Sequence, residues 1–184
     1  VLVATVERLL AAAINTALTV TDADSTNLTG ATVSITAGFT AGDVLGFTTQ
    51  NGISGSYNSA TGVLTLTGTA TVANYQVALR SVTYNSTSDT PTATSASRTV
   101  SWQVNDGSAA NNLSAVATST IAITAVNDAP TDIALSSASV AENSAVGTTV
   151  GTLSTTDPDT ANTFTYSLVT GTGSTDNASF TISG

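Results

Sequence analysis

Cysteine, histidine, lysine and methionine are all absent from this chain of 184 residues, and its positive side chains are three arginines. Without cysteine there is no disulfide or thiolate metal site, and without histidine the commonest acid/base group and metal ligand is missing. The 12 aspartates and glutamates are therefore the only abundant side chains that could bind a metal or take part in catalysis, and carboxylate oxygens suit hard cations. Because no histidine, cysteine or lysine can act as base or nucleophile, we do not expect an enzyme.

Negative charge dominates the chain, whose formal net charge is -9. Such a chain repels nucleic acid, so no nucleic-acid partner is expected. No run approaches the roughly 18 apolar residues of a membrane span, so we expect no membrane insertion by this segment. The first residues, Val1 to Ile14, have neither the basic start nor the cleavage site of a signal peptide, and we expect the chain to be a piece of a longer protein.

Small and β-branched residues dominate, with little helical periodicity, which predicts an all-β chain. The aromatic content of 5% would suit disorder, but the alternating strand patterns and the charged fraction of only 8% favour a β-sandwich with few large core side chains.

Sequence patterns also place individual elements of this sandwich. Val100, Trp102 and Val104 alternate with polar residues and should face its core. A short helix is expected over 72–79, behind Thr71 as N-cap. Seven strands are expected at residues 17–21, 31–36, 44–48, 63–67, 82–84, 98–105 and 116–124. Before them, residues 1–14 could form either a short helix over 7–13 or an irregular first strand, and we favour the strand. Turn chemistry marks residues 51–52, 58–62 and 106–107.

A joint, Asn127-Asp128-Ala129-Pro130, separates two strand patterns. Residues 121–126 alternate like a closing strand, a new strand opens at 132–135, and the proline between them cannot continue a ladder. We therefore expect one complete β-sandwich domain over 1–126, a linker over 127–130 and the N-terminal part of a second, truncated sandwich over 131–184. Strands of the second part are expected at 132–135, 149–153, 164–168 and 179–182.

Carboxylates recur at the same spacing in both parts. Glu7 precedes Asp22-Ala23-Asp24 by 15 residues, and Glu142 precedes Asp157-Pro158-Asp159 by the same 15. Two carboxylates at i and i+2 on an extended chain point the same way and repel, a cost that a bound cation removes. A single Asp-x-Asp would more simply be a solvated turn, but two copies, each preceded by glutamate, favour calcium. An EF-hand is excluded, because neither loop has its glycine or its closing glutamate.

Two sets of segments carry a family resemblance. The first set comprises Glu142-Asn143, Asp157-Pro158-Asp159, residues 176–182 and the joint at 126–130. The second comprises residues 18–24, 62–68 and 104–107. The first set resembles the calcium-binding motifs of cadherin repeats, and the second resembles the tandem cadherin-like domains of very large bacterial surface proteins and adhesins. The resemblance extends over nearly everything from Glu7 onward, and it implies an Ig-like/cadherin-like antiparallel β-sandwich that is extracellular and binds calcium.

In cadherins, calcium lies at the joint between domains. Carried onto this chain, the resemblance implies the interdomain calcium ligands Glu7, Asn127, Asp128, Asp157 and Asp159. It further implies a half-site toward an upstream domain at Asp22, Asp24 and Asp106, and a half-site toward a downstream domain at Glu142. The four carboxylates of the interdomain set neutralise at most two calcium ions, so one or two ions are expected there.

The favoured function is a structural and adhesive repeat module of an extracellular surface protein or fibre, whose joint stiffens on binding calcium. Its partners would be neighbouring repeats, copies of itself, or cell-surface and matrix ligands. An alternative is a self-assembling extracellular filament subunit, which completes its partial sandwich by strand addition from a neighbouring copy. A carbohydrate-binding sandwich ranks lower, because few aromatic side chains remain once the core has taken Trp102 and the phenylalanines.

Overall fold

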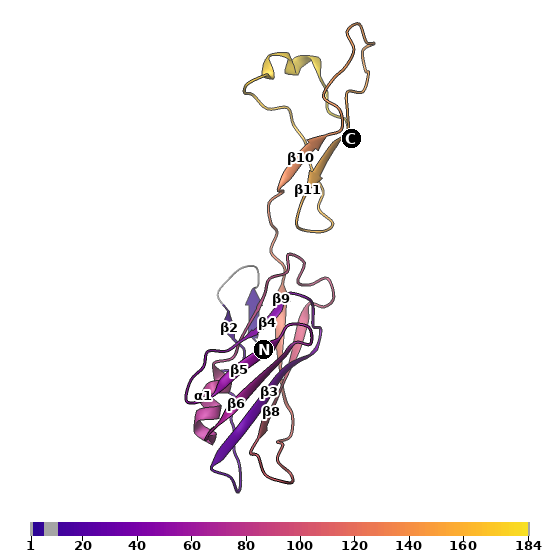
Figure 1. The fold of residues 1–184 in the computed structure, drawn as a ribbon. Helices are drawn as coiled ribbons and strands as arrows, with labels where there is room; N and C mark the ends of the chain where they lie inside the picture. Colours follow the sequence, from indigo (N-terminus) through magenta and orange to yellow (C-terminus); the bar gives the residue numbers. More distant parts are fainter. Residues whose placement is uncertain (1, 6–10, 184) are drawn as a thin grey trace. The chain divides into compact units, whose positions relative to one another are not determined.

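The computed structural model describes residues 2–5 and 11–183. The chain forms two compact units, Val1–Asn127 and Asp128–Gly184 (Figure 1). Within the described residues, the first unit is built mainly from antiparallel strands with one α-helix, and the second contains one antiparallel strand pair and one short 3-10 helix. The predicted all-β class is therefore confirmed.

The first unit is a β-sandwich of two sheets. The strands of the larger sheet are β1 (Leu2–Thr5), β3 (Asn27–Ala37), β5 (Ser54–Asn58), β6 (Val63–Thr71), β8 (Ser97–Asn105) and β9 (Ala117–Thr124). Their order across the sheet is β1-β9-β8-β3-β6-β5, and the outermost pair, β1 with β9, is parallel. The smaller sheet contains β2 (Ala12–Ala13), β7 (Thr83–Ser86) and β4 (Asp43–Gly46), in that order. The central strand β3 pairs antiparallel with both β6 and β8.

The hydrophobic core lies between these sheets. On β8, Val100 and Trp102 are buried and Val104 is half-buried against the core, as the alternating pattern predicts. On β9, Ile121 is buried too and pairs with Arg98. Trp102 is a core residue whose indole Nε1 donates a hydrogen bond to Ser119 Oγ over 3.0 Å. Each fully buried side chain of this size contributes about 1.5 to 3 kcal/mol. The core thus fixes which face of each strand points to solvent.

The predicted helix is present as α1 (Val72–Arg80), beside β6 (Figure 1). Thr71 is its N-cap, because the Asn74 amide donates to Thr71 Oγ1 over 3.2 Å. Its apolar face buries Tyr75 and Leu79, and the Tyr75 hydroxyl donates to Gly68 O over 2.7 Å. The helix therefore closes one side of the core, as its spacing predicts.

One expectation for the first unit was wrong, and one strand was missed. Residues 17–21 form no strand, because side chains of α1 take their backbone groups: Arg80 Nε donates to Leu18 O over 2.7 Å, and the Val20 amide donates to Gln76 Oε1 over 3.1 Å. Strand β5 was not predicted, because its sequence SGSYN lacks alternating apolar residues and its pairing with β6 defines it. The turn predicted at 51–52 is confirmed by positive φ angles at Asn51 and Gly52.

The second unit contains one hairpin, β10 (Asp132–Leu135) paired antiparallel with β11 (Leu153–Thr156). The first strand has the predicted bounds, whereas the strand expected at 149–153 lies further along the chain. The strands expected at 164–168 and 179–182 are absent, and the 3-10 helix η1 (Ser174–Ser179) ends on the first residue of the latter range. All buried apolar residues of the described chain belong to the first unit, and Ile133 on β10 is 60% exposed. Without a facing layer, apolar periodicity alone does not form a strand here.

A buried ion pair joins the two sheets of the first unit. Arg98 on β8 and Asp43 on β4 are 0% and 1% exposed, and Arg98 Nε lies 2.6 Å from Asp43 Oδ2. The Tyr84 hydroxyl donates to Asp43 Oδ1 over 2.6 Å, and burial raises the pKa of this tyrosine. Arg98 Nη2 also donates to Pro91 O over 2.7 Å. The pair is thus held by further hydrogen bonds, the condition under which a buried charge pair is tolerated.

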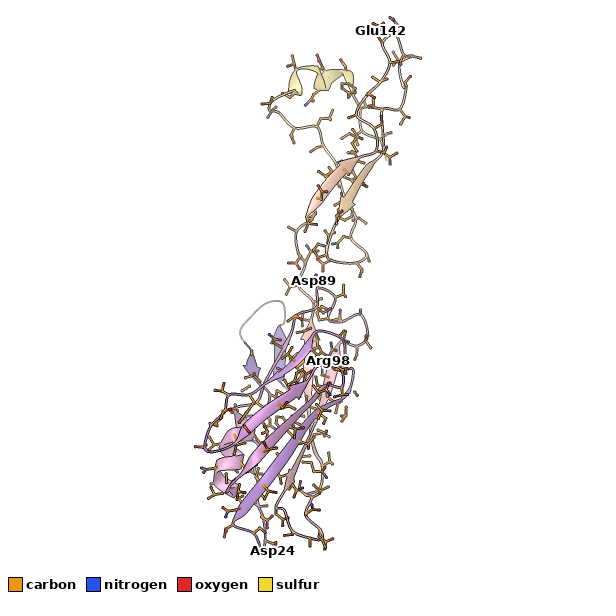
Figure 2. The ribbon with its side chains drawn as sticks, viewed as in Figure 1. Asp24, Asp89, Arg98 and Glu142 are labelled. Carbon is orange, nitrogen blue, oxygen red and sulfur yellow. The ribbon has the colours of Figure 1, made fainter. Side chains whose placement is uncertain are left out.

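We expect Asp43→Asn to lower the free energy of unfolding by about 3 to 5 kcal/mol, because Arg98 would keep a buried charge without its counter-charge. Urea unfolding monitored by Trp102 fluorescence measures this change. The control is Asp89→Asn, an exposed acid in a loop, which should change stability by less than about 0.5 kcal/mol (Figure 2). Equal effects of the two substitutions would contradict a structural role for the pair.

Candidate metal centre

Three aspartates meet at one end of the first unit. Asp22, Asp24 and Asp106 each place a carboxylate oxygen within 4.8 Å of those of the other two. The first two precede β3 and the third follows β8, and because these strands are antiparallel neighbours, the start of one lies beside the end of the other. Figure 2 shows Asp24 at this end of the unit, with Asp89 at the opposite end. The structure therefore brings together the three residues that the resemblance assigned to one half-site.

A tight turn holds the first carboxylate of this cluster. The backbone amides of Asp24 and Ser25 donate to Asp22 Oδ1 over 3.1 and 2.7 Å. Hydrogen bonds to a carboxylate favour its charged form. The Ser25 amide, followed by the Asp24 amide, lowers the pKa of Asp22, although the nearby Asp106 carboxylate acts in the opposite direction. The turn therefore presents an ionised carboxylate at the end of the sheet.

The second loop presents Asp106 in the same way. The Ser108 amide donates to Asp106 Oδ1 over 2.8 Å and the Ser108 hydroxyl to Oδ2 over 2.9 Å, and these two bonds lower the pKa of Asp106. Gly107 has a φ of +83°, and a Cβ there would lie 2.7 Å from Thr29 Cγ2, so glycine is required at this position. The predicted turn at 106–107 is thereby confirmed.

Ser25 links the two loops. Its amide donates to Asp22 and its hydroxyl donates to Asp106 Oδ2 over 3.2 Å, across a separation of 81 residues in the chain. Sequence reasoning did not single out this serine, because only the pairing of β3 with β8 brings it to Asp106. It is a positioning residue for both carboxylates.

The chemistry of the cluster suits a hard divalent cation. Oxygens bound to one calcium ion at about 2.3 to 2.6 Å lie at most roughly 5 Å apart, and the three carboxylate oxygens lie within 4.8 Å of one another, which is compatible with one shared ion. Three carboxylates repel one another, and a cation would remove that repulsion. Asp24 is exposed and its partners are half-buried, so water can complete a coordination shell of 6 to 8 oxygens. Soft metals are disfavoured, because the ligand set contains only oxygen.

The acidic loop of the second unit repeats the same turn. The Asp159 amide donates to Asp157 Oδ1 over 2.8 Å, as the Asp24 amide does to Asp22. Asn162 Nδ2 donates to the same Oδ1 over 3.0 Å, and the Asp128 amide donates to Asp159 Oδ2 over 2.6 Å. Asp157 Oδ2 is buried without a hydrogen-bond partner among the described residues, and a cation would satisfy this atom.

The predicted ligands differ in where the structure places them. Asp128, Asp157 and Asp159 are neighbours in the second unit, but in the described part of the chain only the Asp22 set forms a three-acid cluster. Glu142 is exposed between β10 and β11, at the end of the hairpin opposite Asp157 (Figure 2). Asn127 ends the first unit, and Glu7 lies outside the described residues. The interdomain ligand set stays a prediction.

The fold and site define an acidic, all-β chain with a candidate cation-binding cluster. No protein-family model and no solved structure matches it. The chain is similar to a protein named halomucin from Haloquadratum walsbyi (strain DSM 16790 / HBSQ001), with 43% identity over 100 residues. That match covers 51% of this chain and 1% of the relative, so the similarity concerns one small segment of a far longer protein. None of the helices in the described residues is long and apolar enough to span a membrane.

We expect Asp22 and Asp106 to titrate below the ordinary aspartate value of about 3.9, because both carboxylates accept hydrogen bonds when charged. Their contribution to stability is then complete above that value and is lost as the pH falls through the lowered pKa. Carboxyl-detected NMR titration measures both. Ser25→Ala removes the hydroxyl but keeps the amide, so the pKa of Asp106 should rise while that of Asp22 stays. Midpoints at or above the ordinary value would contradict this account.

Proposed function

We propose that this chain is a calcium-binding structural module of an extracellular surface protein or fibre. The observation that carries the proposal is the meeting of Asp22, Asp24 and Asp106 from two loops that are distant in sequence. The same amide-to-carboxylate turn at Asp157-Pro158-Asp159, with its unpartnered buried oxygen, supports a second calcium position of related design. The chain is not proposed to be an enzyme.

The exposure of the cluster sets the kind of calcium site. An open site with three protein carboxylates does not reach the affinity of a cytosolic calcium buffer, and extracellular modules bind calcium at about 10⁻⁴ to 10⁻³ M. A site of this affinity is filled only where calcium is abundant. The proposed location of the module is therefore outside the cell.

Calcium would act here as a structural cross-link. Asp22 and Asp24 lie before β3 and Asp106 lies after β8, so one ion bound to all three joins two loops that backbone hydrogen bonds do not hold directly. Binding to the folded state alone stabilises that state by linkage. The similarity to a segment of a far longer protein supports a role as one module among many, and neighbouring repeats, copies of itself or matrix ligands are its proposed partners.

One observation favours the filament subunit as a second candidate function. In the second unit the two-stranded sheet exposes apolar side chains, including Ile133 at 60% and Leu135 at 44%. Strands from a neighbouring copy could pair with the free edges of this hairpin and extend it into a larger sheet, and a second such sheet could then face these side chains. Sedimentation velocity over a hundredfold range of protein concentration tests this candidate, and a monomer throughout would exclude it.

We expect calcium at about 10 mM to stabilise the first unit by roughly 1.4 kcal/mol, the linkage value for a dissociation constant of about 1 mM. Differential scanning calorimetry with calcium and with excess chelator measures the shift. Asp106→Asn should abolish it, whereas Asp132→Asn, an exposed acid that begins β10, should leave it intact. Asp157→Asn tests the second position in the same way.

Two outcomes would contradict calcium binding. One is a melting temperature of the unmodified chain that does not respond to calcium. The other is an equal response to calcium and to the same ionic strength of sodium chloride, which would show charge screening rather than a site.

A further inference from the structure

The outer face of the six-stranded sheet carries no charge. Strands β3, β5, β6, β8 and β9 together contain one charged residue, Arg98, and that residue is buried. Serine, threonine, asparagine and glutamine side chains cover the solvent side instead. For a chain with a net charge of -9, a face without carboxylates is a distinct surface. An ionic ligand gains no charge pairing on it, whereas a neutral one meets no repulsion.

A hollow of about 270 Å³ lies on this face. Its floor is Gly30, which pairs in register with Thr67 on β6 and Asn105 on β8. Two residues further along β3, Thr32 pairs with Thr65 and Gln103. Residues at i and i+2 point to the same face of a sheet, so a side chain is missing from the middle of this array. A Cβ at Gly30 would lie 3.3 Å from Leu66 O.

One wall of the hollow is apolar. Leu113 lies in the loop after β8, forms a bridge with Asn105 and is 54% exposed. The loop is held by hydrogen bonds from the Asp106 amide to Asn112 O and from the Ser114 amide to Val104 O, at 3.1 and 3.0 Å. The leucine therefore stands at the rim on an ordered segment.

The polar groups around the hollow are partly uncommitted. Gln103 donates through Nε2 to Ser114 O, which leaves its Oε1 as an acceptor. Asn105 accepts through Oδ1 from Gly107 and Asn112, which leaves its Nδ2 as a donor. Within the described residues, the hydroxyl of Thr32 makes no hydrogen bond to protein. The site thus offers one donor, one acceptor and a hydroxyl that can be either.

We propose that this hollow binds one unit of a neutral oligosaccharide. Sugar hydroxyls both donate and accept, which matches Gln103 Oε1, Asn105 Nδ2 and Thr32 Oγ1, and the C–H face of a sugar ring would pack on Leu113. The volume is at the small end for ligand sites, which suits one ring of a chain that extends over the open sheet face. A second copy of the protein is a poorer occupant, because this face lacks the aromatic anchors that typify protein interfaces.

This site needs no aromatic side chain on which a sugar could stack. The small number of aromatic residues, which argued against carbohydrate binding from the sequence alone, therefore does not exclude it. It goes beyond the proposed calcium role, since none of its three polar ligands belongs to the acidic cluster. A site of this kind binds weakly, and repetition along a longer chain would raise its avidity.

The test uses the full 184-residue chain on an array of neutral oligosaccharides with sialylated and sulfated counterparts, in calcium and in chelator. The strongest neutral oligosaccharide is then titrated into ¹⁵N-labelled protein. We expect binding of neutral sugars in both buffers, with amide shifts at Thr32, Gln103 and Asn105. Binding that persists in chelator supports the site even where the calcium proposal fails.

Matched variants locate the site. Thr32→Val removes one hydroxyl without changing shape and should weaken binding about tenfold, the loss of one well-made hydrogen bond. Thr120→Val makes the same change on the outer face of β9, away from the hollow, and should leave binding unchanged. The proposal is overturned by an array with no neutral sugar bound, by binding of anionic sugars alone, by shifts that map elsewhere, or by equal losses in the two variants.

Discussion

The antiparallel pairing of β3 with β8 is the interaction on which the rest of the first unit depends. It places Val33 opposite Trp102 in the core and Gly30 opposite Asn105 at the end of the sheet. A slip by one residue would move every side chain of β3 to the other face. The ion pair of Arg98 with Asp43 fixes the opposite end of β8 against the second sheet. The same register sets both the candidate metal centre and the uncharged hollow, since each is built from these two strands and the loops that adjoin them.

The acidic side chains of this molecule lie mainly in its loops and rarely in its strands. Apart from Asp43 and Asp132, which begin β4 and β10, and Asp176, which lies in the 3-10 helix η1, the acidic residues of the described chain lie in turns and loops, where water and backbone amides can solvate them. Carboxylates gathered at the end of the sheet repel one another, and hydrogen bonds from the amides of Ser25 and Ser108 stabilise the charged forms of Asp22 and Asp106, whose pKa values are lowered. A divalent cation is the simplest remedy available to a chain whose described cations are Arg80 and Arg98.

The sequence predicted the elements whose signals are local. The alternation of Val100 with Trp102 and the cap at Thr71 can be recognised from neighbouring residues. These two local signals correctly predicted β8 and α1. Strand β5 exists because β6 lies beside it, and residues 17–21 are not a strand because α1 supplies their partners, so neither outcome is visible locally. Among the described residues of the second unit, the apolar side chains repeat at strand spacing but form one hairpin, because no facing layer covers them there.

The candidate site shows the same limit. Asp22 and Asp24 are marked by their recurrence at Asp157 and Asp159, but their meeting with Asp106 was expected only through a family resemblance. The link through Ser25 and the buried pair of Arg98 with Asp43 cross 81 and 55 residues, and no periodicity encodes such separations. Which polar side-chain atoms remain free at the hollow likewise depends on tertiary structure, because the loop after β8 supplies hydrogen-bond partners to some of them and not to others.

Calcium titration of ¹⁵N-labelled protein tests the central claim most directly. The amides of Ser25 and Ser108 donate to Asp22 and Asp106, so both should respond when one ion binds the cluster. The account predicts saturable shifts of these two amides with one shared midpoint, at about 10⁻⁴ to 10⁻³ M calcium. Shifts that fail to saturate, or two amides that titrate with different midpoints, would contradict a single ion held by both loops.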